Sequence, residues 1–143
     1  MSLYAYPDGH YELHLGATHE AVQLYHQGKR TLVHVPLEWP VLQAPKAQGA
    51  EDDPGSLSVV VLRPLKVGDK VGLYMPPRVR LTPITSIETM PLHDMEIGHL
   101  VALGRTEADM DAYRASWDLC WAEEGFPWSS NPDVLEIRWE PLQ

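Results

Sequence analysis

The chain has 143 residues, a length typical of one domain, and we expect residues 1–143 to form a single domain. Hydrophobic residues make up 44% and charged residues 22%, which excludes a largely disordered chain. The chain has one cysteine, which excludes a disulfide framework. It contains no run of 18 apolar residues, so no membrane span is predicted. The first ten residues lack the pattern of a secretory signal, so we expect a soluble, cytoplasmic protein with no membrane partner.

The formal net charge of −9 is unevenly spread: residues 1–85 are neutral overall, and residues 86–143 carry the whole excess. Binding to extended DNA requires many phosphate-neutralising cations, so this acidic chain is not expected to coat DNA. One basic cluster, opposed only by Asp69, contains Arg63, Lys66, Lys70, Arg78 and Arg80. It is either a solvated face or a small patch that contacts an anionic ligand or RNA.

The first third of the chain predicts two strands separated by a helix. Alternating apolar residues indicate a strand from His10 to Leu15. Thr18 can cap a helix from His19 to Gln27, which Gly28 would end. The β-branched run from Thr31 to Pro36 indicates the second strand.

The middle of the chain predicts a loop and three further strands. Residues 45–56 are polar and rich in Gly and Pro, so we expect an exposed loop that proteases cut first. Strands are expected over Leu57–Leu62 and, after a turn at residues 65–70, over Val71–Met75. Apolar residues alternate with polar ones from Arg78 to Met90, and this alternation shifts by one residue at Pro83. The shift predicts an edge position or a β-bulge at the proline.

The last third predicts two helices and a strand. Residues 92–103 suggest a helix ended by Gly104, and Thr106 can open a second helix that ends at Gly125. The second helix has one apolar face, made of Met110, Tyr113, Trp117, Cys120 and Trp121.

A loop over residues 126–132 precedes the final strand, in which Leu135, Ile137 and Trp139 alternate with charged residues. About six strands and three short helices, with no βαβ rhythm, predict an α+β fold. We expect a small mixed, mainly antiparallel β-barrel or sheet with helices attached.

Sequence motifs for metal, cofactor or nucleophile chemistry are weak. Along a strand, His10 and His14 would lie roughly 13 Å apart, which is too far for one ion, and the other histidines are scattered. We therefore expect no metal site and no cofactor. No phosphate-binding loop, dinucleotide fingerprint or nucleophile elbow is present. Cys120, between Trp117 and Trp121, is expected to be a small buried hydrophobe.

Trp128 departs from core periodicity, because it lies in a Pro- and Ser-rich loop beside Asn131. An indole next to an amide can stack on a base and read its edge. Alternatively, Trp128 closes one end of the fold and bonds its N–H to the backbone.

Five segments in the same order resemble ASCH domains of a bacterial and phage branch. They are LKVGDKVGLY (65–74), RVRLTPITSIE (78–88), LHDM with ALG (92–104), YRASWD (113–118) and GFPWSSNPDVLEI (125–137). The resemblance covers about residues 60–140 and implies a PUA-like β-barrel.

In that family a segment lining the cleft follows the first helix, and residues 28–35 occupy its place here. The lysine, threonine and glutamate implicated in the family's hydrolases then fall on Arg30, Val33 and Leu103. Valine and leucine cannot activate a nucleophile or carry protons, and arginine is a poor general base. A shift of one residue would substitute Lys29 for Arg30. We assign no catalytic residue and leave enzymatic activity open.

The sequence thus favours a non-catalytic PUA-like module that binds a nucleotide, a modified base or a short RNA. Its cleft would lie between the 28–34 segment and the 126–132 loop, with Arg30 and Trp128 both facing this cleft and Lys29, Thr31 and Asn131 at its rim. The expected ligand contacts are Lys29, Arg30, Thr31, Arg78, Arg80, Trp128 and Asn131. Two alternatives stay open: a small amidohydrolase or ribonuclease with a rearranged site, and an accessory protein-interaction domain with a decayed cleft.

Overall fold

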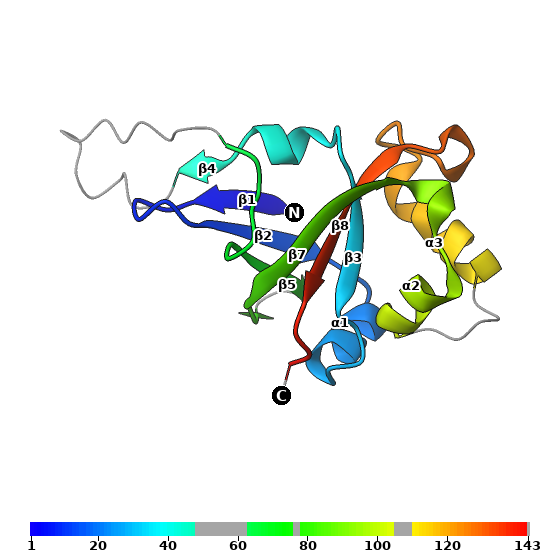
Figure 1. Cartoon of the computed structure of the whole chain (residues 1–143), viewed down its shortest axis with the longest axis horizontal. Helices are drawn as coiled ribbons and strands as arrows, with labels where there is room; N and C mark the ends of the chain where they lie inside the picture. Colours follow the sequence, from blue (N-terminus) through cyan, green and yellow to red (C-terminus); the bar gives the residue numbers. More distant parts are fainter. Residues whose placement is uncertain (48–62, 76–77, 105–109, 143) are drawn as a thin grey trace.

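A computed structural model describes residues 1–47, 63–75, 78–104 and 110–142, which form a sheet with helices gathered at one end (Figure 1). The strands are β1 (Ser2–Ala5), β2 (Tyr11–Gly16), β3 (Leu32–Pro36), β4 (Lys46–Ala47), β5 (Lys70–Met75), β6 (Arg78–Val79), β7 (Thr82–Pro91) and β8 (Asp133–Trp139). The helices are α1 (His19–His26), α2 (Ile97–Ala102) and α3 (Met110–Trp121), with short 3-10 turns η1 (Pro40–Gln43), η2 (Leu92–Asp94) and η4 (Trp128–Ser130).

The strands form one mixed sheet in the order β3-β8-β7-β5-β2-β1-β4, and β6 pairs with β5. Pairs β1–β4 and β2–β5 are parallel, and the others are antiparallel. The predicted α+β class, mainly antiparallel pairing and three helices are therefore confirmed. The expected closed barrel is wrong, because β3 and β4 lie at opposite ends of an open sheet.

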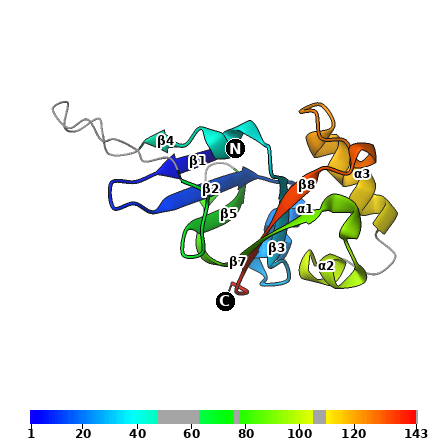
Figure 2. The same cartoon turned by 45° about the horizontal axis from the view of Figure 1, so that its top comes forward.

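Strand β7 joins the two halves of the sheet. Its first residues, Thr82 and Pro83, pair with β5, whereas the rest of the strand pairs with β8. The register shifts between Ile84 and Ser86, next to the proline where the sequence predicted an edge or a bulge. This irregularity lets one strand belong to two differently oriented halves, as the turned view shows (Figure 2).

Helix α1 begins and ends as its sequence predicts. The Thr18 side chain accepts a hydrogen bond from the Ala21 N–H (3.2 Å) at the N-terminus. At the other end Gly28 has a positive φ of 73°, and a Cβ there would lie 2.7 Å from the Leu142 carbonyl oxygen. The turn that leads into β3 therefore requires glycine for both conformation and space.

Replacing Gly28 with alanine should lower the free energy of unfolding by about 2 kcal/mol or more, because left-handed strain adds to the clash. Gly9→Ala is the matched control, since Gly9 also has a positive φ (92°) but has open space around its Cβ position. Urea unfolding of both variants measures the difference. Equal losses at the two positions would contradict the close approach of Leu142.

One prediction of secondary structure needs correction, and one strand was missed. The helix expected over residues 92–103 is split into η2 and α2, because Met95 is extended and Glu96 starts a new N-terminus. Glu96 and His99 form a capping box there, with the Glu96 N–H donating to His99 Nδ1 (2.9 Å). Strand β1 was not predicted at all.

Parts of other predictions lie outside the described residues. These are the strand expected over 57–62, most of the loop at 45–56, and the helix start at Thr106. Within that predicted loop, Lys46–Ala47 forms the short strand β4 beside β1.

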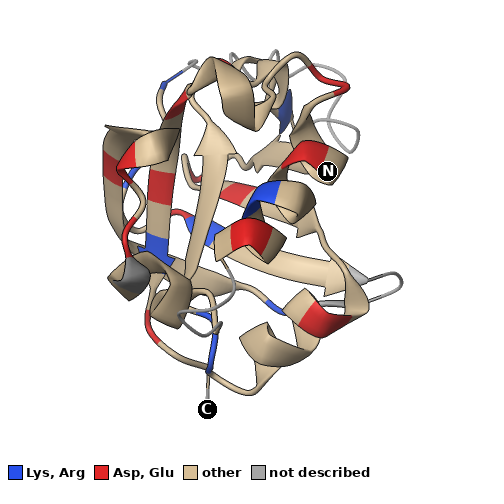
Figure 3. Ribbon diagram, turned by 90° about the vertical axis from the view of Figure 1, so that its right-hand side faces the viewer, with Lys and Arg blue, Asp and Glu red and all other residues tan. Residues whose placement is uncertain are grey.

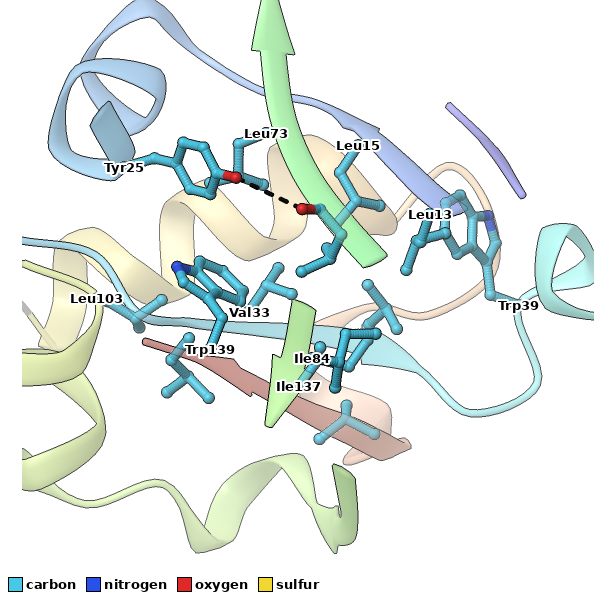
Figure 4. Close-up of a cluster of buried hydrophobic side chains, with 14 of the residues drawn as sticks. Leu13, Leu15, Tyr25, Val33, Trp39, Leu73, Ile84, Leu103, Ile137 and Trp139 are labelled. Carbon is cyan, nitrogen blue, oxygen red and sulfur yellow. Dashed lines mark hydrogen bonds between the residues drawn. The ribbon is translucent and has the colours of Figure 1, made fainter. Parts of the chain in front are cut away.

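The core lies between the two halves of the sheet and the helices (Figure 4). Tyr25 of α1 is fully buried and donates its hydroxyl to the Arg80 carbonyl (2.6 Å). Tyr113, Trp117 and Trp121 of α3 are buried at the predicted helical spacing. Cys120 does not join them: it is exposed, which corrects the expectation of a buried thiol.

Candidate ligand cavity at the open edge of the sheet

A cavity of about 250 Å³ lies beside β3, the strand at one end of the sheet. One wall is the segment leading into β3 and β3 itself, with Arg30 and Val33. The opposite wall is α3, with Tyr113, Trp117 and Cys120, and the end of β2 and start of α1 complete the lining. The cavity thus combines a guanidinium, two large aromatic rings and a thiol.

Arg30 is half-buried beside this cavity and is tied to the strand it precedes. Its Nε donates to the Leu32 carbonyl (3.1 Å), and its own carbonyl accepts from Trp139 Nε1 (3.0 Å). Lys29 is exposed next to it, whereas Thr31 is half-buried and donates its N–H to the Ala102 carbonyl (2.8 Å). These bonds fix the main chain around Arg30.

Trp128 does not line this cavity but belongs to a neighbouring aromatic group. Its ring stacks on His93 with centroids 4.9 Å apart, and Arg114 lies 5.2 Å from its centroid. Asn131, in a left-handed conformation, accepts the His93 N–H on its side-chain oxygen (2.8 Å). Tyr113 contacts Trp128 edge-on (6.2 Å) and also lines the cavity, so it separates Arg30 from Trp128.

The basic cluster predicted from the sequence is partly neutralised. Arg63 forms two hydrogen bonds of 2.8 Å with the buried Asp69, so its charge is already paired. Arg80 is exposed, and the side chain of Arg78 lies outside the described part. A second hollow of about 330 Å³ beside Arg63 is lined mainly by leucines, and its one guanidinium is held by Asp69. On the side of the molecule that carries α3, basic and acidic residues are interspersed (Figure 3).

A buried histidine–carboxylate cluster next to the cavity was not predicted. His99 Nε2 lies 3.1 Å and Arg138 Nη2 lies 2.8 Å from the same oxygen, Oε1, of Glu136. His34 Nε2 lies 3.7 Å from that oxygen, and neither ring nitrogen of His34 has a hydrogen-bond partner among the described residues. Burial lowers the pKa of His34 to about 4, although nearby Glu136 opposes the shift, so the ring is neutral at pH 7.

The hydrogen bonds of this cluster disfavour a metal site. His34, His99 and Glu136 place possible ligand atoms within 4.8 Å of one another, as a zinc site would. However, His99 Nδ1 accepts the Glu96 N–H, so Nε2 of the neutral ring carries the proton that Glu136 accepts. A ligating histidine normally donates through its other nitrogen, which is the reverse arrangement. We therefore treat the group as a hydrogen-bonded cluster and derive no metal chemistry from it.

The hydrolase positions implied by the resemblance hold no catalytic set. Val33 lines the cavity, and Leu103 is buried in the core. Arg30 is the one polar side chain of the three, and its Nε is bonded to the main chain. None of these three positions supplies a general base.

Comparison with known proteins supports the fold assignment. No family model matches the chain, and no curated protein matches its sequence. An ASCH domain from Lactobacillus crispatus superposes with a TM-score of 0.57 at 12% identity, over 90% of this chain and 79% of that one. A DUF984 protein from Enterococcus faecalis superposes with a TM-score of 0.53 at 10% identity, over 99% and 80%.

The open mixed sheet and three helices define an α+β fold. More narrowly, the fold is that of ASCH domains, as the order of sequence motifs predicted. Within the described ranges, no helix is long and apolar enough to cross a membrane.

Proposed function

We propose that this chain is a non-catalytic binding module that takes the base of a small nucleotide-like ligand into the cavity between β3 and α3. The observation that carries the proposal is that Arg30, Tyr113 and Trp117 line one cavity. An aromatic wall can stack on a base, and a guanidinium can hold a phosphate or carbonyl.

Size and charge support a small ligand. A volume of about 250 Å³ is slightly below that of typical sites for drug-sized molecules, and it suits one base better than a longer chain. The net charge of −9 opposes binding of long polyanions. Glu20 also lines the cavity, which favours a ligand whose buried part is uncharged.

The remaining predicted contacts would serve parts of the ligand outside the cavity. Lys29 and Thr31 flank Arg30 and would meet a phosphate or sugar at the rim. In a short RNA, neighbouring nucleotides could reach further groups. These proposed outer contacts are Arg78, Arg80, Trp128 and Asn131.

Calorimetric titration with the four ribonucleosides and their 5′-monophosphates tests the proposal. We expect at least one pair to bind, and Arg30→Ala to weaken the monophosphate about tenfold at low salt, with a smaller difference at high salt. Lys70→Ala is the control, because it removes one exposed positive charge away from the cavity and should change affinity less than twofold. Absence of binding by the whole panel, or no effect of Arg30→Ala, would contradict the proposal.

Cys120 provides an independent reporter, since it is the one cysteine of the chain, is exposed and lines the cavity. A ligand in the cavity should slow alkylation of this thiol in proportion to its occupancy. Turnover of an acylated cytidine under the same conditions would instead support the hydrolase alternative. Unchanged alkylation at saturating ligand would place binding elsewhere on the molecule.

A further inference from the structure

The ladder between β3 and β8 determines which main-chain groups of β3 face the cavity. Trp139 donates its N–H to the Thr31 carbonyl (3.1 Å), and Leu37 donates to the Asp133 carbonyl (2.9 Å). In an antiparallel pair, directly opposed residues alternate between exchanging hydrogen bonds and pointing away from each other. Counting from either bonded pair, the pair of His34 and Glu136 is one that does not exchange hydrogen bonds. The N–H and C=O of His34 therefore point away from β8.

These two groups lie at the surface of the cavity. His34 lines the cavity, and the residue as a whole is 3% exposed, whereas its side chain is 0% exposed. The exposed part of His34 is therefore its main chain. The imidazole is buried on the other side, against Glu136 and His99.

The adjacent positions on this edge prevent addition of another strand. The Leu32 carbonyl already accepts a bond from Arg30 Nε (3.1 Å). Pro36 has no N–H to donate, which is typical of an edge that does not pair. Strand β3 therefore presents one hydrogen-bond donor and one acceptor to the cavity, both from His34. This pair suits a small molecule and not an extended peptide.

We propose that the main chain of His34 selects ligands with a planar edge on which a hydrogen-bond acceptor stands beside an N–H donor. The inference rests on the proposed function of the cavity and names the chemical class it takes. The His34 N–H would donate to a ring nitrogen or carbonyl, and the His34 C=O would accept from the adjacent N–H. The amino-pyrimidine edges of cytosine and adenine carry this pair, and the rings of Tyr113 and Trp117 would border the base plane.

A series of cytidines that differ at the exocyclic nitrogen tests this selection. Cytidine should bind most tightly, and N4-methylcytidine, which retains one N–H, should bind more tightly than the dimethyl analogue. N4,N4-dimethylcytidine lacks the donor, leaves the His34 C=O without a partner, and should bind at least tenfold more weakly. The same comparison with adenosine and N6,N6-dimethyladenosine checks that the effect follows the donor and not one base.

Amide hydrogen exchange locates the contact. Saturating cytidine should slow exchange of the His34 N–H, because that group donates to the ring nitrogen of the bound base. Binding of nucleosides without discrimination against the dimethyl analogues, or without protection of His34, would overturn this inference and leave the proposed function standing. Failure of all nucleosides to bind would overturn both.

Discussion

Replacing Trp117 with alanine should lower the free energy of unfolding by about 3–5 kcal/mol, as large aromatic truncations in cores do. Trp117 is 3% exposed, packs against Trp121 with ring centroids 5.7 Å apart, and donates Nε1–H to the Phe126 carbonyl (2.8 Å). Truncation removes the packing of α3 against the sheet and leaves that carbonyl without its donor. Urea unfolding measured by circular dichroism gives the loss.

Two controls separate the causes of this loss. Leu119 is on the same helix but is 86% exposed, so Leu119→Ala should change stability by less than about 0.5 kcal/mol. Trp117→Phe keeps a ring but removes the N–H, so it should fall between the other two variants. A loss below 1 kcal/mol for Trp117→Ala would show that α3 does not depend on this residue for docking.

Local signals in the sequence predicted α3 and α1 well, because their determinants lie within a few residues of each other. Spacings of three and four placed Tyr113, Trp117 and Trp121 on one buried face. Thr18 and Gly28 marked the two ends of α1 through a side-chain cap and a left-handed conformation. Each of these features follows from helix geometry alone.

Other features depend on contacts between distant parts of the chain. Apolar spacing suggested a continuous helix over residues 92–103, but a capping box at Glu96 restarts it. The sequence showed only that charged residues alternate with Leu135, Ile137 and Trp139 in the last strand. Glu136 is nevertheless buried, where it contacts His99 of α2. Nothing local to Glu136 could reveal a partner 37 positions earlier in the chain.

The candidate site was predicted only in part, for the same reason. Arg30 of the 28–34 segment lines the cavity, and α3 contributes to its lining in place of the 126–132 loop. Whether a sheet closes is decided by strand pairing at its two ends. Here Pro36 and the bond from Arg30 to Leu32 leave β3 as an open edge. The cavity lies beside this edge strand, and its lining from α3 lies about 80 positions further along the chain, so no local signal could reveal it.

A second large effect on stability should come from Asp69, which organises the turn before β5. Its carboxylate is 1% exposed and accepts four bonds: two from Arg63 (2.8 Å each), one from the Lys66 N–H (2.8 Å) and one from the Tyr11 N–H (2.9 Å). Arg63 also lies over the Tyr11 ring, 4.0 Å from its centroid. Asp69→Ala should lower the free energy of unfolding by about 3–5 kcal/mol, because it breaks a buried ion pair and strands two main-chain donors. Lys66→Ala is the control: it keeps the main-chain N–H, removes only an exposed side chain, and should be nearly neutral.

The contribution of Asp69 should depend on pH in a defined direction. Burial by itself would raise the pKa of Asp69, but the Arg63 guanidinium and the N–H groups of Lys66 and Tyr11 outweigh it, so the pKa lies below its ordinary value of 3.8. A carboxyl group whose pKa is lowered by folding stabilises the protein above its unfolded pKa and loses that effect as pH falls through the folded one. The stability difference between the native chain and Asp69→Asn should therefore be constant from pH 7 to pH 5 and should decrease only below about pH 4. Urea unfolding of both proteins across this range measures it. A difference that already declines between pH 7 and pH 5 would mean that another group, titrating nearer neutrality, controls this turn.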